Sequence, residues 1–179
     1  MDKFSLPHIW AMRLWFLALA LLIMFFHLIP LETVPRNWAP PDLLIAFAFA
    51  WIMRRPDFVP ALSLAAVMLM ADLLFLRPPG LLALLAVLGS EYLKNRTAGL
   101  SEASFVGEWI SVSFVILAMT LLYRLILNLT LVDQAPVILN VIQMILTIAV
   151  YPLVVFVTQS VMGVRRPAPG DADVMGARG

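Results

Sequence analysis

Side chains that can take part in acid–base or ion-pair chemistry are sparse in this sequence, and five of them interrupt or border long apolar runs. These five are His27, Asp42, Asp72, Arg77 and Arg124. In apolar surroundings, carboxylates and arginines form either a polar pocket for a ligand or ion pairs that hold helices together. The sequence has no HExxH, GxSxG or P-loop motif and no cysteine. We therefore predict that the protein is not an enzyme and holds no metal or cofactor.

The segments that carry these residues have the composition of membrane helices. Of the 179 residues, 63% are hydrophobic and 13% charged, and the mean hydropathy is +0.97. A soluble domain typically has about 25% charged residues. We therefore expect an all-α integral membrane protein in contact with a lipid bilayer. The net charge of +1 gives no reason to expect a nucleic-acid partner.

Apolar segments separated by proline and charge predict six membrane-spanning helices. The segments cover residues 13–31, 40–53, 58–76, 80–93, 105–123 and 136–162. The second and fourth have only about 12–13 strongly apolar residues, which cover roughly 20 Å of a 30 Å hydrocarbon core. We expect these two short spans to extend, to thin the bilayer or to be shielded by neighbouring helices. Residues 1–162 then form one membrane domain, and residues 163–179 a disordered cytoplasmic tail.

Basic residues are divided unequally between the two sides of this six-span bundle. One side has nine: Lys3, Arg13, Arg54, Arg55, Lys94, Arg96, Arg165, Arg166 and Arg178. The other side has two, Arg36 and Arg77. Because basic residues concentrate in cytoplasmic loops, this bias predicts that both termini are cytoplasmic and that the number of spans is even. Arg124 lies inside an apolar segment, and we expect it to snorkel toward the outer interface.

With this orientation, His27, Asp42, Asp72 and Arg124 fall in the outer half of the membrane. They could form a polar pocket that is open to the outside. Alternatively, Asp42 caps the second helix, and Asp72 pairs with Arg77 or Arg124 to fix helix packing. We favour the cap for Asp42, leave both alternatives open for Asp72, and interpret His27 as an interior hydrogen-bonding residue.

The middle of the chain carries a degenerate pattern of proline, aspartate and glycine. It comprises Pro41-Asp42-Leu43 at the start of one span, Arg55-Pro56 after it, Asp72-Leu73-Leu74 at the end of the next, and Pro79-Gly80 in the following turn. From Pro41 to Leu93 the sequence resembles the MreD family of rod-shape-determining membrane proteins. It departs from the family at Phe75 to Pro78, where serine and glycine are frequent.

The resemblance implies a non-enzymatic scaffold in the bacterial cytoplasmic (inner) membrane. Such a scaffold belongs to the machinery that elongates the cell by peptidoglycan synthesis, and it binds the single-span MreC protein by lateral helix contacts. It would also connect cytoplasmic MreB filaments with a RodA-type glycosyltransferase and a class B penicillin-binding protein. Independently of the resemblance, the short second and fourth spans cannot face lipid along their full length, and we expect them to provide a recess for a partner helix.

A second hypothesis is a substrate-binding membrane subunit of a small-molecule uptake transporter, similar to the six-span components of vitamin transporters. A transporter subunit requires a cavity into which several polar donors converge, whereas a scaffold requires an exposed groove between helices. The predicted outer loops are short and poor in polar and aromatic side chains. This observation favours the scaffold.

Overall fold

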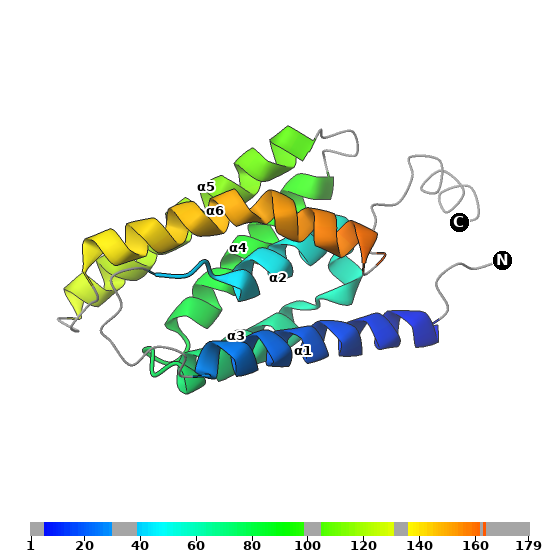
Figure 1. The fold of residues 1–179 in the computed structure, drawn as a ribbon, viewed down its shortest axis with the longest axis horizontal. Coiled ribbons are helices and arrows are strands. Elements are labelled where there is room, and N and C mark those ends of the chain that lie inside the picture. The colour runs from blue at the N-terminus through cyan, green and yellow to red at the C-terminus, as the bar shows by residue number, and fades with distance from the viewer. Residues whose placement is uncertain (1–5, 30–38, 99–104, 131–135, 162, 164–179) are drawn as a thin grey trace.

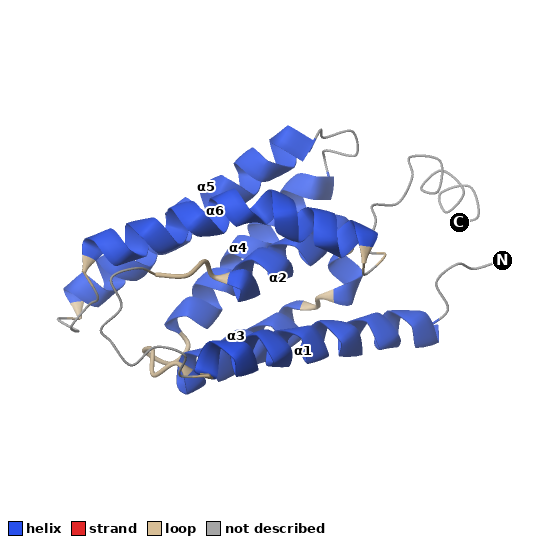
Figure 2. Ribbon diagram, in the orientation of Figure 1, coloured by secondary structure: helices blue, strands red, loops and turns tan. Residues whose placement is uncertain are grey.

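The computed structural model describes residues 6–29, 39–98, 105–130, 136–161 and 163, and 87% of these residues are helical. This part of the chain contains no strand (Figure 2). The helices are α1 (Leu6–Leu28), α2 (Leu43–Arg54), the 3₁₀ helix η1 (Pro56–Phe58), α3 (Ala61–Leu74), α4 (Leu81–Ala98), α5 (Phe105–Leu129) and α6 (Val137–Ser160). The predicted all-helical class is confirmed for the described residues. The tail predicted for residues 163–179 lies, except for Gly163, outside them.

Three of the described helices are long and apolar enough to cross a membrane: α1, α5 and α6. Helices α5 and α6 have 25 and 24 residues, a length of about 36 Å each at 1.5 Å per residue. The chain therefore has the character of a membrane protein. Helix α5 continues without a break to Leu129, six residues past the expected end of this span near residue 123.

The centre of the bundle is the short helix α2, which packs against α1, α4, α6 and η1 (Figure 1). Ten of its twelve residues are buried, among them Phe49, Trp51 and Arg54. Among the outcomes expected for a short span, shielding by neighbouring helices is the one observed. Neighbouring protein, and not lipid, then surrounds α2, so its length does not have to match the bilayer.

The expected short fourth span is longer in the structure. Helix α4 has 18 residues and continues to Ala98, five residues past the end of the apolar run. The additional turn carries Lys94 and Arg96, and Lys94 forms an ion pair with Glu91 at 2.8 Å. Helix α3, in contrast, has 14 residues where 19 were expected, because Phe58 belongs to η1 and Pro60 precedes the first turn of α3.

Two glycines shape the packing of α4. Gly80 has φ +87° in the turn from α3 into α4, a conformation that residues with a side chain rarely adopt. Gly89 lies where α4 meets α5: a Cβ atom there would stand 2.7 Å from Val115 Cγ1. The absence of a side chain at Gly89 therefore allows the two helices to approach closely.

Candidate functional site: a polar cavity and a buried ion pair

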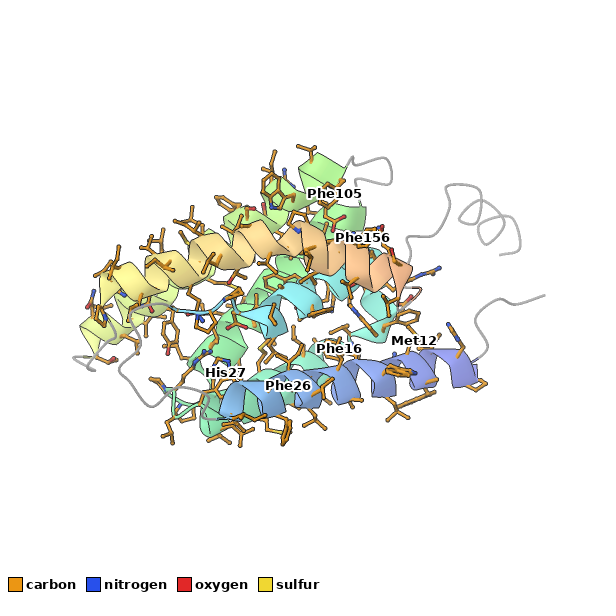
Figure 3. The ribbon with its side chains drawn as sticks, in the orientation of Figure 1. Met12, Phe16, Phe26, His27, Phe105 and Phe156 are labelled. Atoms are coloured by element: carbon orange, nitrogen blue, oxygen red, sulfur yellow. The ribbon has the colours of Figure 1, made fainter. Side chains whose placement is uncertain are left out.

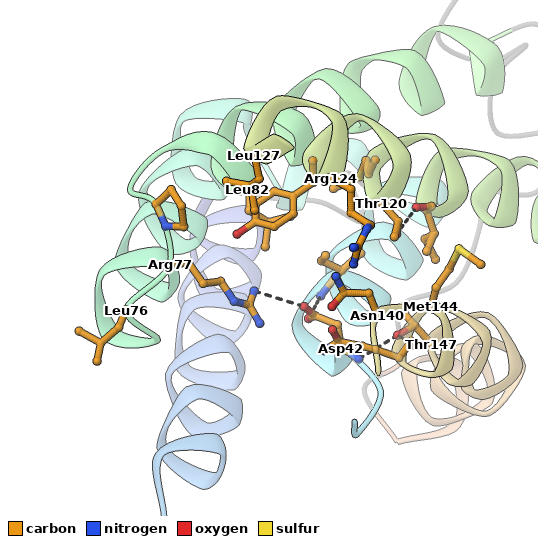
Figure 4. A pocket seen from close by; sticks show the side chains of 16 residues that line it. Asp42, Leu76, Arg77, Leu82, Thr120, Arg124, Leu127, Asn140, Met144 and Thr147 are labelled. Carbon is orange, nitrogen blue, oxygen red and sulfur yellow. Dashed lines mark hydrogen bonds and ion pairs between the residues drawn. The ribbon is translucent and has the colours of Figure 1, made fainter. Parts of the chain in front are cut away.

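A cavity of about 430 Å³ lies between α2, the α3–α4 turn, α4, α5 and α6 (Figure 4). Its charged lining residues are Asp42, Arg77 and Arg124. Its uncharged polar lining residues are Thr120, Tyr123, Asn140, Gln143 and Thr147. Three of the five predicted site residues are therefore brought together at one site. The polar side chains of α5 and α6 that join them were not predicted as site residues.

Asp42 contacts three of the elements that enclose the cavity. Its Oδ1 atom accepts a hydrogen bond from the Ile45 N–H at 3.1 Å, which caps the N-terminus of α2 as predicted. Its Oδ2 atom lies 3.7 Å from Arg77 Nη1. The Asp42 N–H donates to Thr147 Oγ1 at 2.9 Å. One residue thus connects α2 with α6 and with the α3–α4 turn.

The two arginines enter the cavity from different elements. Arg77 extends from the α3–α4 turn, with its guanidinium carbon 5.2 Å from the centre of the Phe75 ring. Arg124 extends from α5 and also lines the cavity (Figure 4). Arg124 is partly buried and lines the cavity, so its side chain is covered in part by protein, and its expected snorkelling toward the outer interface stays a prediction.

Asp72 does not line the cavity, and its side chain forms no hydrogen bond or ion pair with the arginines expected as its partners. It is 0% exposed, which confirms that it faces protein. Its Oδ2 atom accepts hydrogen bonds from the N–H groups of Gly80 at 3.1 Å and Ala83 at 3.3 Å. The first N–H groups of a helix lack partners within the helix and lie at its positive end. These N–H groups donate the hydrogen bonds that were expected from an arginine, so Asp72 connects α3 to the start of α4.

His27 is not among the residues that line the cavity, and it lies at the end of α1 (Figure 3). It is exposed, and its ring centre lies 4.4 Å from that of Phe75, so it connects the end of α1 with the end of α3. The interpretation of His27 as an interior residue is therefore wrong. Its contact is made at the surface, beside a large apolar ring.

A buried ion pair at the other end of α2 was not predicted. Arg54 Nη1 lies 2.7 Å from Glu108 Oε1, and Tyr151 donates a hydrogen bond to the same oxygen at 2.6 Å. Arg54 and Glu108 are each 2% exposed and Tyr151 is 0% exposed. From its place after the second apolar segment, Arg54 was expected in a cytoplasmic loop. The available signal was Glu108, an acidic residue in the first turn of a long apolar helix, which requires a buried partner.

Within the described ranges, no group of three or more histidine, aspartate or glutamate side chains could hold a metal ion. These residues form an all-helical membrane-type protein with a polar cavity at one end of its central helix and an ion pair at the other. Comparison with known proteins adds no identification, since no family model, no curated protein and no solved structure matches the chain.

Proposed function

We propose that this protein is a non-enzymatic scaffold of the bacterial cell-elongation machinery and that it binds an MreC-like single-span protein through lateral helix contacts. The resemblance between Pro41 and Leu93 is the reason for naming this machinery. Three residues of the sequence pattern that resembles this family have clear structural roles. Asp42 caps α2, Asp72 binds the start of α4, and Gly80 forms the turn between α3 and α4. The proposed connections to MreB, the RodA-type glycosyltransferase and the class B penicillin-binding protein rest on the resemblance alone.

The observation that supports lateral contact with a partner helix is the exposure of α1. Only 17% of its most apolar stretch is buried, compared with 33% for α5 and 28% for α6. Its large exposed residues include Trp10, Leu14, Leu21 and Phe25. Intervals of four, seven and four residues place these side chains in one stripe along the helix. Such a stripe suits close van der Waals packing against a second helix in lipid.

The proposal includes six membrane crossings with both termini in the cytoplasm. Successive helices run in alternating directions along the long axis (Figure 1), as consecutive crossings require. The nine-to-two distribution of basic residues supports the orientation. Fusions placed after residues 32, 76 and 133 to a reporter that works only outside the cytoplasm should be active. Activity of a fusion at either terminus would contradict this topology.

Partner contact can be tested by cross-linking, because the chain has no cysteine of its own. Leu14→Cys or Leu21→Cys should form disulfides with cysteines scanned along the span of an MreC-like partner, with helical periodicity. Leu153→Cys on α6 is the matched control, since Leu153 is 63% exposed and Leu14 is 64% exposed. Equal cross-linking at the control position, or no recovery of a partner from native membranes, would refute lateral contact through α1.

The polar cavity favours a second candidate, the substrate-binding subunit of a small-molecule uptake transporter of the vitamin type. Several polar groups converge in it, which is the feature that distinguishes this hypothesis from the scaffold. Purification from native membranes separates the two candidates. A vitamin-like ligand bound in one-to-one stoichiometry, with no protein partner recovered, would support the transporter subunit.

A further inference from the structure

We propose that the cavity beside Asp42 binds an uncharged molecule that carries several hydroxyl groups on an apolar body, supplied either by a glycolipid or by a soluble glycoside. Such a ligand site is independent of the binding of a protein partner, so its absence would leave the scaffold proposal unaffected. Under the transporter candidate it names the chemical class of the substrate.

The charged side chains of the lining are already engaged with protein. Arg77 Nη1 lies 3.7 Å from Asp42 Oδ2, and Asp42 Oδ1 accepts the hydrogen bond from the Ile45 N–H. Arg124 also has an interaction partner of its own. A charged ligand of either sign would be repelled by one member of the Asp42–Arg77 pair and would compete for the other. An uncharged ligand leaves these contacts in place.

Uncharged side chains of α5 and α6 supply the unused hydrogen-bonding capacity of the cavity. Thr120 and Thr147 each donate to a backbone carbonyl one turn earlier in their own helix. In contrast, the partly buried side chains of Tyr123, Asn140 and Gln143 form no hydrogen bond within the described parts of the chain. Two amides and a phenol combine donors with acceptors. A ligand that matches them must offer both as well, and hydroxyl groups do.

The Asp42–Arg77 pair suits a hydroxyl group for a second reason. The two side chains face the cavity from the start of α2 and from the α3–α4 turn (Figure 4). Their 3.7 Å separation is longer than a hydrogen bond. One ligand hydroxyl can therefore donate to the carboxylate and accept from the guanidinium at the same time. A phosphate can only accept and an ammonium can only donate, so neither serves both groups.

The size and the remaining lining of the cavity indicate what the hydroxyl groups are attached to. At about 430 Å³ the cavity falls within the range of roughly 300–1,000 Å³ that is typical of small-molecule sites. The rest of its lining is mostly apolar, from Ile45, Leu82, Ile116, Met119, Leu127 and Met144. Polar groups beside apolar walls match a sugar or polyol that is joined to an apolar body.

Binding can be measured on the full chain in phosphatidylcholine nanodiscs, because sugar-based detergents would compete for the site. The probes are monoglucosyl diacylglycerol, followed by native mass spectrometry, and phenyl β-glucoside, followed by calorimetry. The matched control for each probe carries methyl ethers in place of all its sugar hydroxyls. We expect at least one glucoside to bind about tenfold or more tightly than its methylated counterpart. No binding of either glucoside, or equal binding of the methylated controls, would overturn the proposal.

Two comparisons among the probes identify the source of the ligand and its charge. Binding of the glucosyl lipid alone supports a lipid source, and binding of phenyl β-glucoside supports a soluble source. Phenyl β-glucuronide has the same body with a carboxylate on the sugar, and we expect it to bind more weakly than phenyl β-glucoside. Tighter binding of the glucuronide would show an anion site and overturn the proposal.

Substitutions on α6 test whether the bound probe occupies this cavity. Asn140→Leu and Gln143→Met should each weaken binding about tenfold, because each removes hydrogen bonds to the ligand and keeps the size of the side chain. Gln159→Met is the matched control, because Gln159 is an exposed glutamine of the same helix outside the cavity lining. An equal loss of affinity in Gln159→Met would overturn the proposal.

The Tyr123→Phe variant provides the mildest test, because it removes one hydroxyl group and keeps the ring. None of the three substituted side chains, Tyr123, Asn140 and Gln143, forms a hydrogen bond within the described ranges. We therefore expect all three variants to keep the helix content of the unmodified protein, which circular dichroism measures. Tyr123→Phe should bind the glucoside several-fold more weakly. Full affinity in all three folded variants would overturn the proposal.

Discussion

Replacing Asp72 by leucine should destabilise the protein much more than replacing it by asparagine. The Asp72 side chain is fully buried and accepts hydrogen bonds from the N–H groups of Gly80 and Ala83. Leucine leaves both N–H groups without an acceptor, at about 1–3 kcal/mol each. The leucine variant no longer buries a carboxylate, and the free energy regained in this way offsets part of the loss. The net destabilisation is then about 2–4 kcal/mol. Asparagine keeps one carbonyl oxygen as acceptor, and we expect about 1–2 kcal/mol.

The free energy of unfolding can be measured by titrating sodium dodecyl sulfate into mixed micelles, with helix content followed by circular dichroism. Asp57 provides the matched control, because it is an exposed acidic residue in η1. Asp57→Leu and Asp57→Asn should each change the unfolding free energy by less than about 0.5 kcal/mol. If Asp72→Leu is as stable as Asp72→Asn, the two backbone hydrogen bonds do not hold α3 to α4 as argued.

Three further predictions concern other contacts. Glu108→Gln should lower the unfolding free energy by about 3–5 kcal/mol because it leaves Arg54 charged and buried. The double variant Arg54→Met/Glu108→Leu should lower it less than this single change, because it removes both charges. The same detergent titration measures both variants. Gly89→Ala should lower the melting temperature, and Val115→Ala should restore part of the loss by making room for the added Cβ atom; full stability of Gly89→Ala alone would refute the close contact. Asp42→Ala should cost about 1 kcal/mol and Asp42→Asn a few tenths, since only alanine removes the helix cap; equal unfolding midpoints would contradict this.

Features that depend on neighbouring residues were predictable from the sequence. The cap at the start of α2 follows from an aspartate directly before an apolar helix, with its N–H partner three residues away. The burial of Asp72 follows from the cost of a carboxylate in an apolar run. The helical class follows from the composition, because apolar runs of this length form helices in membranes.

Features that depend on the tertiary fold were not predictable in the same way. The partners of Asp72 lie 8 and 11 residues further along the chain, and they reach it only because of the turn in which Gly80 has a positive φ. Arg54 and Glu108 are 54 residues apart. A sequence read one segment at a time shows that each buried charge needs a partner, but the partner is selected by the packing of helices that are distant in sequence.

The enclosure of α2 imposes an order on the biogenesis of the protein. With 12 residues, α2 spans about 18 Å and is too short to cross the hydrocarbon core alone. Its C-terminal residue Arg54 is buried against Glu108 of α5, 54 residues further along the chain. Glu108 in turn accepts a hydrogen bond from Tyr151 of α6, which lies another 43 residues on. When the ribosome has completed α2, neither partner has been synthesised. The contacts that bury Arg54 can therefore form only after α5 and α6 have been synthesised, and α2 completes its packing only then.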